Sequence, residues 1–187
     1  MNAPVALSYT ADITEAHVGE AIRFESRLRP NYFRFAKSGE AWFSEQLGSG
    51  GVLLTAPHAT AAIRDGRLRG PDTGTGWVAH MLHRLAGVSV LSTTYASPSD
   101  PNYYDDNAFK ARLAVLLERQ RPNLVLDLHG CHFSRPFDVD FGTMHGESLL
   151  GQMHWLEALR EMFVSCGVRR LTDNRFAAAR KIGRAHV

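Results

Sequence analysis

From residue 51 to about residue 128, the sequence alternates short apolar runs with longer amphipathic stretches, and this alternation constrains the fold most. Apolar runs of this length are typical of buried strands, and apolar residues three and four positions apart are typical of helices. Strands that alternate with helices favour a parallel or mixed sheet with helices packed on it. We therefore expect an α/β fold with a mixed, mainly parallel sheet flanked by helices. The expected strands are residues 51–58, 88–93 and 124–128, and the expected helices are residues 73–86 and 107–120.

The remaining segments have less regular patterns. The first fifty residues are rich in aromatic and basic side chains and are broken by Pro30 and the glycines near residue 50, which predicts short strands and a helical turn beside the sheet. Residues 138–141 predict a short strand. Residues 149–166 predict a helix that buries Leu150, Met153, Leu156 and Phe163. A chain of 187 residues, 44% hydrophobic, is suited to a single domain, which we place at residues 1–180.

Two of the predicted strands end in a histidine. One run ends at His58, and the other, Leu124-Val125-Leu126-Asp127-Leu128-His129-Gly130, carries Asp127 and His129 at its end. Ligands of open α/β sheets bind at the carboxyl ends of strands, where His58 and His129 would meet if their strands were parallel neighbours. An imidazole binds Zn²⁺ through one nitrogen and usually donates its other N–H to a carboxylate or carbonyl. Asp127, two residues from His129, can face the same side and orient that ring.

A polar loop between these two strands offers two carboxylates as a third ligand. Asp65 lies early in this loop, and Asp72 lies just before the predicted helix at residues 73–86. An aspartate directly before a helix is also a typical N-cap. The pattern therefore leaves Asp65 and Asp72 as alternatives.

These residues give the sequence a resemblance to the N-formylglutamate amidohydrolase family, whose members are related to zinc carboxypeptidases and aspartoacylases. The resembling motifs are Ala56-Pro57-His58, Arg64-Asp65-Gly66, Asp72-Thr73-Gly74-Thr75-Gly76, Asp100-Pro101-Asn102-Tyr103, Asp127-Leu128-His129-Gly130 and Asp138-Val139-Asp140-Phe141-Gly142-Thr143. The resemblance implies a zinc carboxypeptidase-like fold, also described as phosphorylase/hydrolase-like, and a catalytic Zn²⁺ held by His58, Asp72 and His129. Many relatives have Glu at the acidic position, and the shorter Asp keeps Asp65 as an alternative.

The end of the chain has an unusual origin by our interpretation. Residues 181–187, Lys-Ile-Gly-Arg-Ala-His-Val, can be back-translated into the start of a widely used sequencing adaptor. We expect that these seven residues are artefactual, and that the natural protein and its sheet continue beyond Arg180. In relatives of this kind the glutamate that activates water comes late in the chain, so the general base is expected beyond Arg180.

The expected reaction is hydrolysis of the amide of an N-formyl or N-acyl amino acid. Zn²⁺ with three protein ligands lowers the pKa of bound water to about 7 and polarises a carbonyl. Such a substrate also carries a carboxylate, which pairs well with a guanidinium fork; Arg64 is the first candidate and Arg69 the second. Asp127 is a further candidate catalytic residue. The alternative is a non-catalytic metal- or ligand-binding fragment that lacks the general base.

Composition excludes several other classes of protein. A net charge of +2 and scattered arginines give no basic face for nucleic acid. Two cysteines are too few for a disulfide scaffold. The sequence shows neither a secretory signal pattern nor an apolar run of membrane-spanning length, so we expect a cytoplasmic protein without membrane contact. The absence of a Gly-x-Ser-x-Gly motif and of a Walker-type phosphate loop argues against serine hydrolases and nucleotide-dependent enzymes.

Overall fold

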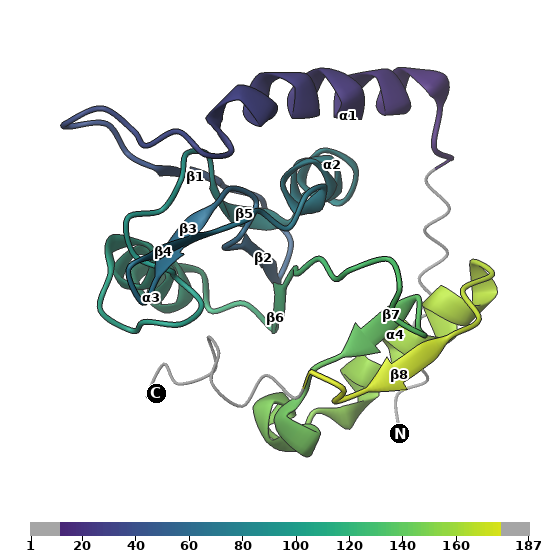
Figure 1. The fold of residues 1–187 in the computed structure, drawn as a ribbon. Coiled ribbons are helices and arrows are strands. Elements are labelled where there is room, and N and C mark those ends of the chain that lie inside the picture. Colours follow the sequence, from purple (N-terminus) through teal and green to yellow (C-terminus); the bar gives the residue numbers. More distant parts are fainter. Residues whose placement is uncertain (1–11, 177–187) are drawn as a thin grey trace.

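The computed structural model describes residues 12–176, and its main sheet has four strands in the order β1-β5-β2-β6 (Figure 1). Strands β5, β2 and β6 are parallel, and β1 runs antiparallel to β5. This confirms the mixed, mainly parallel sheet that the sequence predicted. The strands are β1 (Phe43–Gln46), β2 (Val52–Ala56), β5 (Ser89–Thr93) and β6 (Leu124–Asp127). The adaptor-like residues 181–187 lie outside the described part of the chain.

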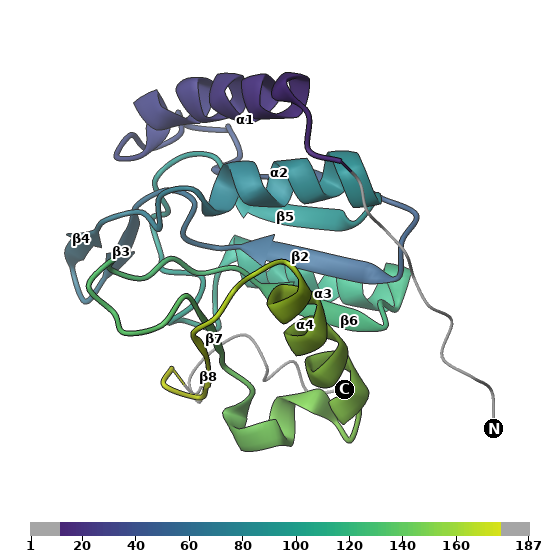
Figure 2. The same ribbon diagram turned by 90° about the vertical axis from the view of Figure 1, so that its right-hand side faces the viewer.

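Helices cover both faces of this sheet. Helices α1 (Glu15–Leu28) and α2 (Thr75–Ala86) lie over one face, and α3 (Ala108–Gln120) lies over the other (Figures 1 and 2). Successive side chains of a strand point to opposite faces, so each strand serves both layers. Leu54 and Val90 pack in a core cluster with residues of α1 and α2. Leu53 and Leu91 pack in a second cluster, with Phe109, Leu113 and Leu116 of α3.

Helix boundaries follow local signals at two of the predicted helices. The Asn107 side chain accepts a hydrogen bond from the Lys110 backbone N–H and caps α3 at the expected position. Helix α2 ends at Gly87, whose φ of +63° is the left-handed conformation that favours glycine. Its start differs from the prediction, because α2 begins at Thr75 after Gly74, and the side chain of Asp72 does not cap it.

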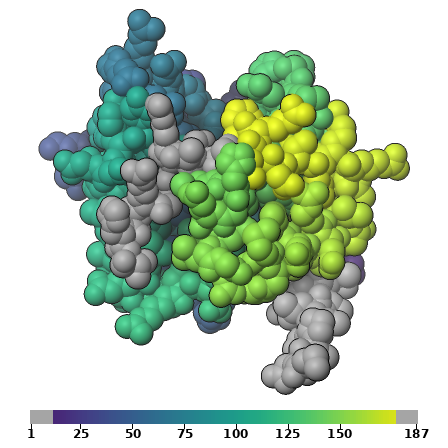
Figure 3. All heavy atoms as spheres, turned by 90° about the horizontal axis from the view of Figure 1, so that it is seen from below, coloured from purple at the N-terminus to yellow at the C-terminus, as the bar shows by residue number. Residues whose placement is uncertain are grey.

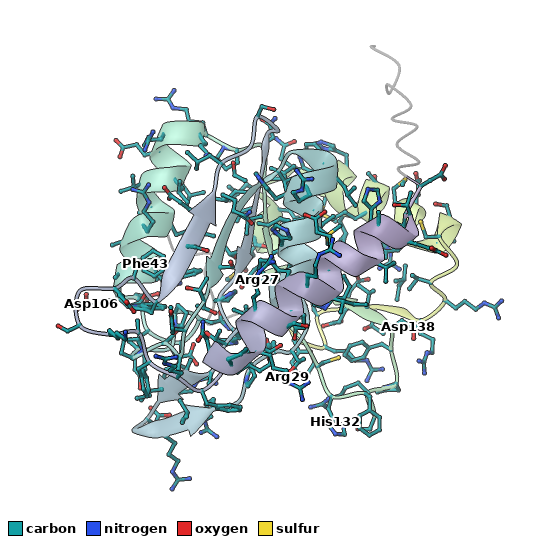
Figure 4. The ribbon with its side chains drawn as sticks, turned by 90° about the horizontal axis from the view of Figure 1, so that it is seen from above. Arg27, Arg29, Phe43, Asp106, His132 and Asp138 are labelled. Carbon is teal, nitrogen blue, oxygen red and sulfur yellow. The ribbon has the colours of Figure 1, made fainter. Side chains whose placement is uncertain are left out.

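The prediction for the first fifty residues missed a long helix within the described residues 12–50. This region contains the 14-residue helix α1, the short 3-10 helix η1 (Arg29–Asn31) and the one short strand β1, so the helical turn and a strand are present but α1 was not predicted. Thr14 starts α1 with a reciprocal capping box in which His17 takes the place usually held by Glu or Gln, so the sequence signal is atypical. Viewed from above, α1 runs across α2 (Figure 4), and Phe24 stacks on His80 of α2.

Two small sheets complete the described fold. Strands β3 (Ala62–Arg64) and β4 (Arg67–Arg69) form a hairpin. Strands β7 (Val139–Phe141) and β8 (Leu171–Asp173) pair in parallel. The 3-10 helix η2 (Met144–Leu149) and helix α4 (Met153–Ser165) lie between these two strands in the sequence. Seen from below, this later part of the chain forms one side of the molecule (Figure 3). Residues 138–141 were therefore correctly predicted to contain a strand.

The helix predicted at residues 149–166 begins later than expected and buries less. Leu150 is 83% exposed and left-handed with φ +48°, and Met153 is also exposed. Leu156 and Phe163 are only half-buried, and no residue of α4 is fully buried. The apolar spacing is real, but α4 has a two-stranded sheet and η2 as neighbours rather than a broad apolar surface. Within residues 12–176, no helix has the length and apolar character that crossing a membrane requires.

Candidate metal centre

Three side chains from separate segments converge at one edge of the main sheet. His58, Asp72 and His129 each offer one ligand atom, and these three atoms lie within 4.8 Å of one another. The Oδ2 atom of Asp72 is 3.0 Å from Nδ1 of His129 and 3.5 Å from Nδ1 of His58. The two imidazole rings are 5.1 Å apart between centroids and meet edge to face. The convergence of the two strand-end histidines is therefore confirmed.

Parallel pairing of β2 and β6 brings the two histidines together. Thr55 is the register partner of Asp127, and the backbone N–H of Leu128 donates to the Thr55 carbonyl at 2.8 Å. His58 lies two residues beyond β2, and His129 lies two residues beyond β6. Both rings thus emerge at the carboxyl ends of adjacent parallel strands, where ligands of α/β sheets usually bind.

A backbone hydrogen bond positions Asp72 at the site. Its N–H donates to the carbonyl of His58 at 2.7 Å, so the loop before α2 is fixed to the segment after β2. Gly130 packs on the other side, where an added Cβ would come within 3.2 Å of the Asp72 Cβ. A close approach of this kind explains why glycine follows His129.

A second carboxylate contacts each imidazole at Nε2, the nitrogen that faces away from Asp72. Nε2 of His58 is 2.8 Å from Oδ1 of Asp100, and Nε2 of His129 is 2.9 Å from Oδ2 of Asp127. An ionised carboxylate only accepts hydrogen bonds, so each Nε2 carries a proton and donates. In a neutral ring this places the lone pair on Nδ1, which is the nitrogen that faces Asp72. Metal-binding histidines are usually oriented in this way.

Electrostatics at the site favour charged groups. Burial opposes ionisation of Asp72, but the hydrogen bonds that His129 and His58 donate when Nδ1 carries a proton outweigh it and hold the pKa of this carboxyl well below its ordinary value. Burial also opposes ionisation of Asp100, and His58 and Arg64 together hold its pKa low. Burial alone would lower the pKa of His58, yet its hydrogen bonds with Asp100 and Asp72 raise it.

The donor set fits a divalent transition metal. Two imidazole nitrogens and one carboxylate oxygen are ligands that zinc accepts in sites with an open fourth position. A tetrahedral ion with ligands at 2.0–2.1 Å would separate those ligands by about 3.3 Å. The distances from Asp72 Oδ2 to the two histidine Nδ1 atoms, 3.0 and 3.5 Å, bracket that value. The residues therefore could hold a metal ion, and the donor set leaves its identity open.

Asp65, the alternative third ligand, lies outside this cluster. Asp65 and Gly66 form the two-residue turn of the β3–β4 hairpin, both with positive φ, and the Asp65 carboxylate accepts a hydrogen bond from the Tyr104 hydroxyl. An Asp-Gly pair is typical of such turns. Asp72, rather than Asp65, is thus the carboxylate that the fold brings to the histidines.

The other predicted site residues have defined surroundings. Asp127 accepts from the Thr55 hydroxyl at 2.7 Å as well as from His129. Arg64 donates from Nε and Nη2 to Oδ2 of Asp100, while Arg69 lies on the exposed strand β4. These positions leave the catalytic roles predicted for Arg64 and Asp127 as predictions.

Asp100 is the residue of the site that sequence reasoning missed. Its motif, Asp-Pro-Asn-Tyr, has the composition of a turn, and a turn is present, with the backbone N–H groups of Asn102 and Tyr103 donating to Oδ1. The signal that could have identified it is its place after β5, beside β2, at the same sheet edge as His58.

No protein-family model, curated protein or solved structure matches this chain.

Proposed function

We propose that the protein is a zinc-dependent amidohydrolase that cleaves the amide of an N-formyl or N-acyl amino acid, such as N-formylglutamate. One observation carries the proposal: His58, Asp72 and His129 present three ligand atoms within 4.8 Å of one another at the carboxyl edge of a parallel sheet. The resemblance of the motifs to N-formylglutamate amidohydrolases supports the substrate class.

The residues of the chain have separate tasks in this proposal. His58, Asp72 and His129 would hold the ion, which when bound would supply a Lewis acid and make water more acidic. Asp100 and Asp127 keep the two imidazoles in the tautomer with the proton on Nε2. Arg64 is 30% exposed and has N–H donors beyond the two on Asp100, so it can bind the substrate carboxylate.

One observation favours a second candidate, a site that binds a metal or ligand without turnover. The carboxylates that contact the two histidines in the described part of the chain include Asp72, Asp100 and Asp127. Asp100 and Asp127 each have both oxygens engaged, and Asp72 Oδ2 faces both histidine Nδ1 atoms. A general base needs a carboxylate within reach of the proton it removes. Firm metal binding without detectable turnover would favour this second candidate.

The test combines metal content with activity. The purified chain is loaded with Zn²⁺, its bound metal is counted, and hydrolysis of N-formylglutamate is followed by release of glutamate. We expect one zinc per chain and a slow turnover that a chelator abolishes, because general-base assistance is typically worth 10²–10⁴-fold. His129→Ala should lose both, whereas His132→Ala, an exposed histidine at the periphery (Figure 4), should keep both. A wild-type chain that binds no zinc would overturn the proposed function.

A further inference from the structure

Asp100 is the most deeply buried charged group at the candidate metal centre. Its side chain is 0% exposed. Oδ1 contacts Nε2 of His58 at 2.8 Å and accepts the backbone N–H groups of Asn102 and Tyr103. Oδ2 accepts Nε and Nη2 of Arg64 at 2.8 and 2.6 Å. One buried carboxylate thus joins an arginine to a metal-binding histidine.

The carboxylate that contacts Nε2 of His129 has a different second partner. Asp127 also holds an imidazole Nε2, but its second oxygen accepts a neutral hydroxyl, that of Thr55. A buried carboxylate without a cation is expensive, and a guanidinium that donates twice to one of its oxygens offsets that cost. Arg64 is itself positioned, because its guanidinium lies over the Tyr103 ring at 4.9 Å from the centroid. On the His58 side, the contacts therefore run from Tyr103 through Arg64 and Asp100 to the imidazole.

We propose that Asp100 is a positioning residue that couples Arg64 to His58, so that the arginine sets the metal affinity of a site to which it contributes no ligand. The inference rests on the metal centre of the proposed function. Arg64 holds Asp100, Asp100 orients the His58 ring, and the orientation of that ring decides whether its Nδ1 faces Asp72. Loss of the guanidinium leaves Asp100 buried without its cation and frees both side chains to rotate.

The first experiment measures Zn²⁺ affinity by competition with a chromophoric chelator in Arg64→Met, Arg64→Lys and Arg67→Met. Removal of a residue that orients a metal-bound histidine typically weakens metal binding 10–100-fold. We expect Arg64→Met to weaken zinc binding about tenfold, and Arg64→Lys to recover part of the loss because it keeps one charged donor for Asp100. Arg67→Met, an exposed arginine of the same hairpin, should bind zinc as the wild type does.

Asp100→Asn and Asp127→Asn give the second comparison, and circular dichroism shows whether each variant folds. Both variants should weaken zinc binding. In the Asp100→Asn background, Arg64→Met should have no further effect, whereas in the Asp127→Asn background it should still weaken binding about tenfold. Equal zinc affinity of Arg64→Met and the wild type would overturn the coupling while leaving the proposed function intact. Absence of zinc binding by the wild type would overturn both. If Asp100→Asn does not fold, the result with Arg64→Met, Arg64→Lys and Arg67→Met decides alone.

Discussion

At the scale of single residues, Asp72 is expected to be the acidic metal ligand, and two alanine variants test this. Asp72 Oδ2 lies between the two histidine Nδ1 atoms, whereas Asp65 is bound to Tyr104 in a hairpin turn. Asp72→Ala should abolish stoichiometric zinc binding, and Asp65→Ala should leave it within about twofold of the wild type. Metal content after gel filtration measures both. Loss of metal in Asp65→Ala alone would contradict the assignment.

The same residues predict how stability depends on pH in the metal-free protein. Asp72 and Asp100 have lowered pKa values, so the stability they contribute is present above the unfolded-state value near 4 and is lost as the pH falls below it. His58 has a raised pKa, so its contribution is complete below about 6.5 and is lost as the pH rises through the folded-state value. In the presence of a chelator, the urea concentration that unfolds half of the protein should therefore be highest between about pH 4 and 6.5.

A matched variant separates the acid and alkaline arms of that profile. His58→Gln keeps a polar side chain but does not titrate, so the decline above about pH 6.5 should shrink. His132→Gln, on the exposed loop after β6, should retain the full profile. An unchanged alkaline arm in His58→Gln would show that another group causes it.

At the scale of elements, the approach of the loop after β6 to the loop before α2 controls the site. Gly130→Ala would place a Cβ 3.2 Å from the Cβ of Asp72, so Asp72 must move by a few tenths of an ångström. We expect zinc affinity to fall several-fold with little change in thermal unfolding. Gly70→Ala is the control, because its added Cβ meets nothing within 4 Å. A similar zinc affinity in the two variants would argue that the loop tolerates the displacement.

Central and peripheral elements should also differ in their contribution to stability. The side chain of Leu53 in β2 is completely buried in the core cluster with α3, whereas Leu156 of α4 is only half-buried. Leu53→Ala should destabilise the fold by about 2–5 kcal/mol, the usual cost of truncating a buried leucine. Leu156→Ala should cost about 1 kcal/mol, near the centre of the range for point substitutions. Urea unfolding followed by tryptophan fluorescence measures both, and equal costs would mean that α4 packs more tightly than its exposure indicates.

At the scale of the whole molecule, the metal centre ties together segments far apart in the chain. Its ligands come from the ends of β2 and β6 and from the loop before α2, so an ion bound only by the folded state stabilises all of these connections. Binding at a free zinc concentration one hundred times the dissociation constant contributes about 2.7 kcal/mol. Addition of Zn²⁺ should therefore raise the melting temperature, and a chelator should reverse the increase. His58→Ala should show no such shift, and a shift of wild-type size in this variant would place the ion elsewhere.

Local sequence patterns predicted the parallel strands β2, β5 and β6, because each lies in a short, mainly apolar run, and the helices between them, because their apolar residues recur at helical spacing. The same patterns located His58 and His129, since a histidine two residues after the end of a parallel strand lies at the carboxyl edge of the sheet. They failed at α1, where His17 replaces the usual acidic capping residue, and at α4, where apolar spacing does not reveal how large a surface is available to bury it.

Only the tertiary structure decided which carboxylates belong to the centre. By residue type alone, Asp65 and Asp72 are equally good candidates. The turn of the β3–β4 hairpin holds Asp65 away from the histidines, whereas the hydrogen bond from the Asp72 backbone N–H to the His58 carbonyl holds Asp72 beside them. Asp100 follows β5, which suggests the same sheet edge, but the sequence does not reveal that β5 is the neighbour of β2. The pairing of β5 with β2 brings Asp100 and His58 together. Local preferences are encoded by neighbouring residues, whereas contacts across strands depend on the order of the strands in the sheet.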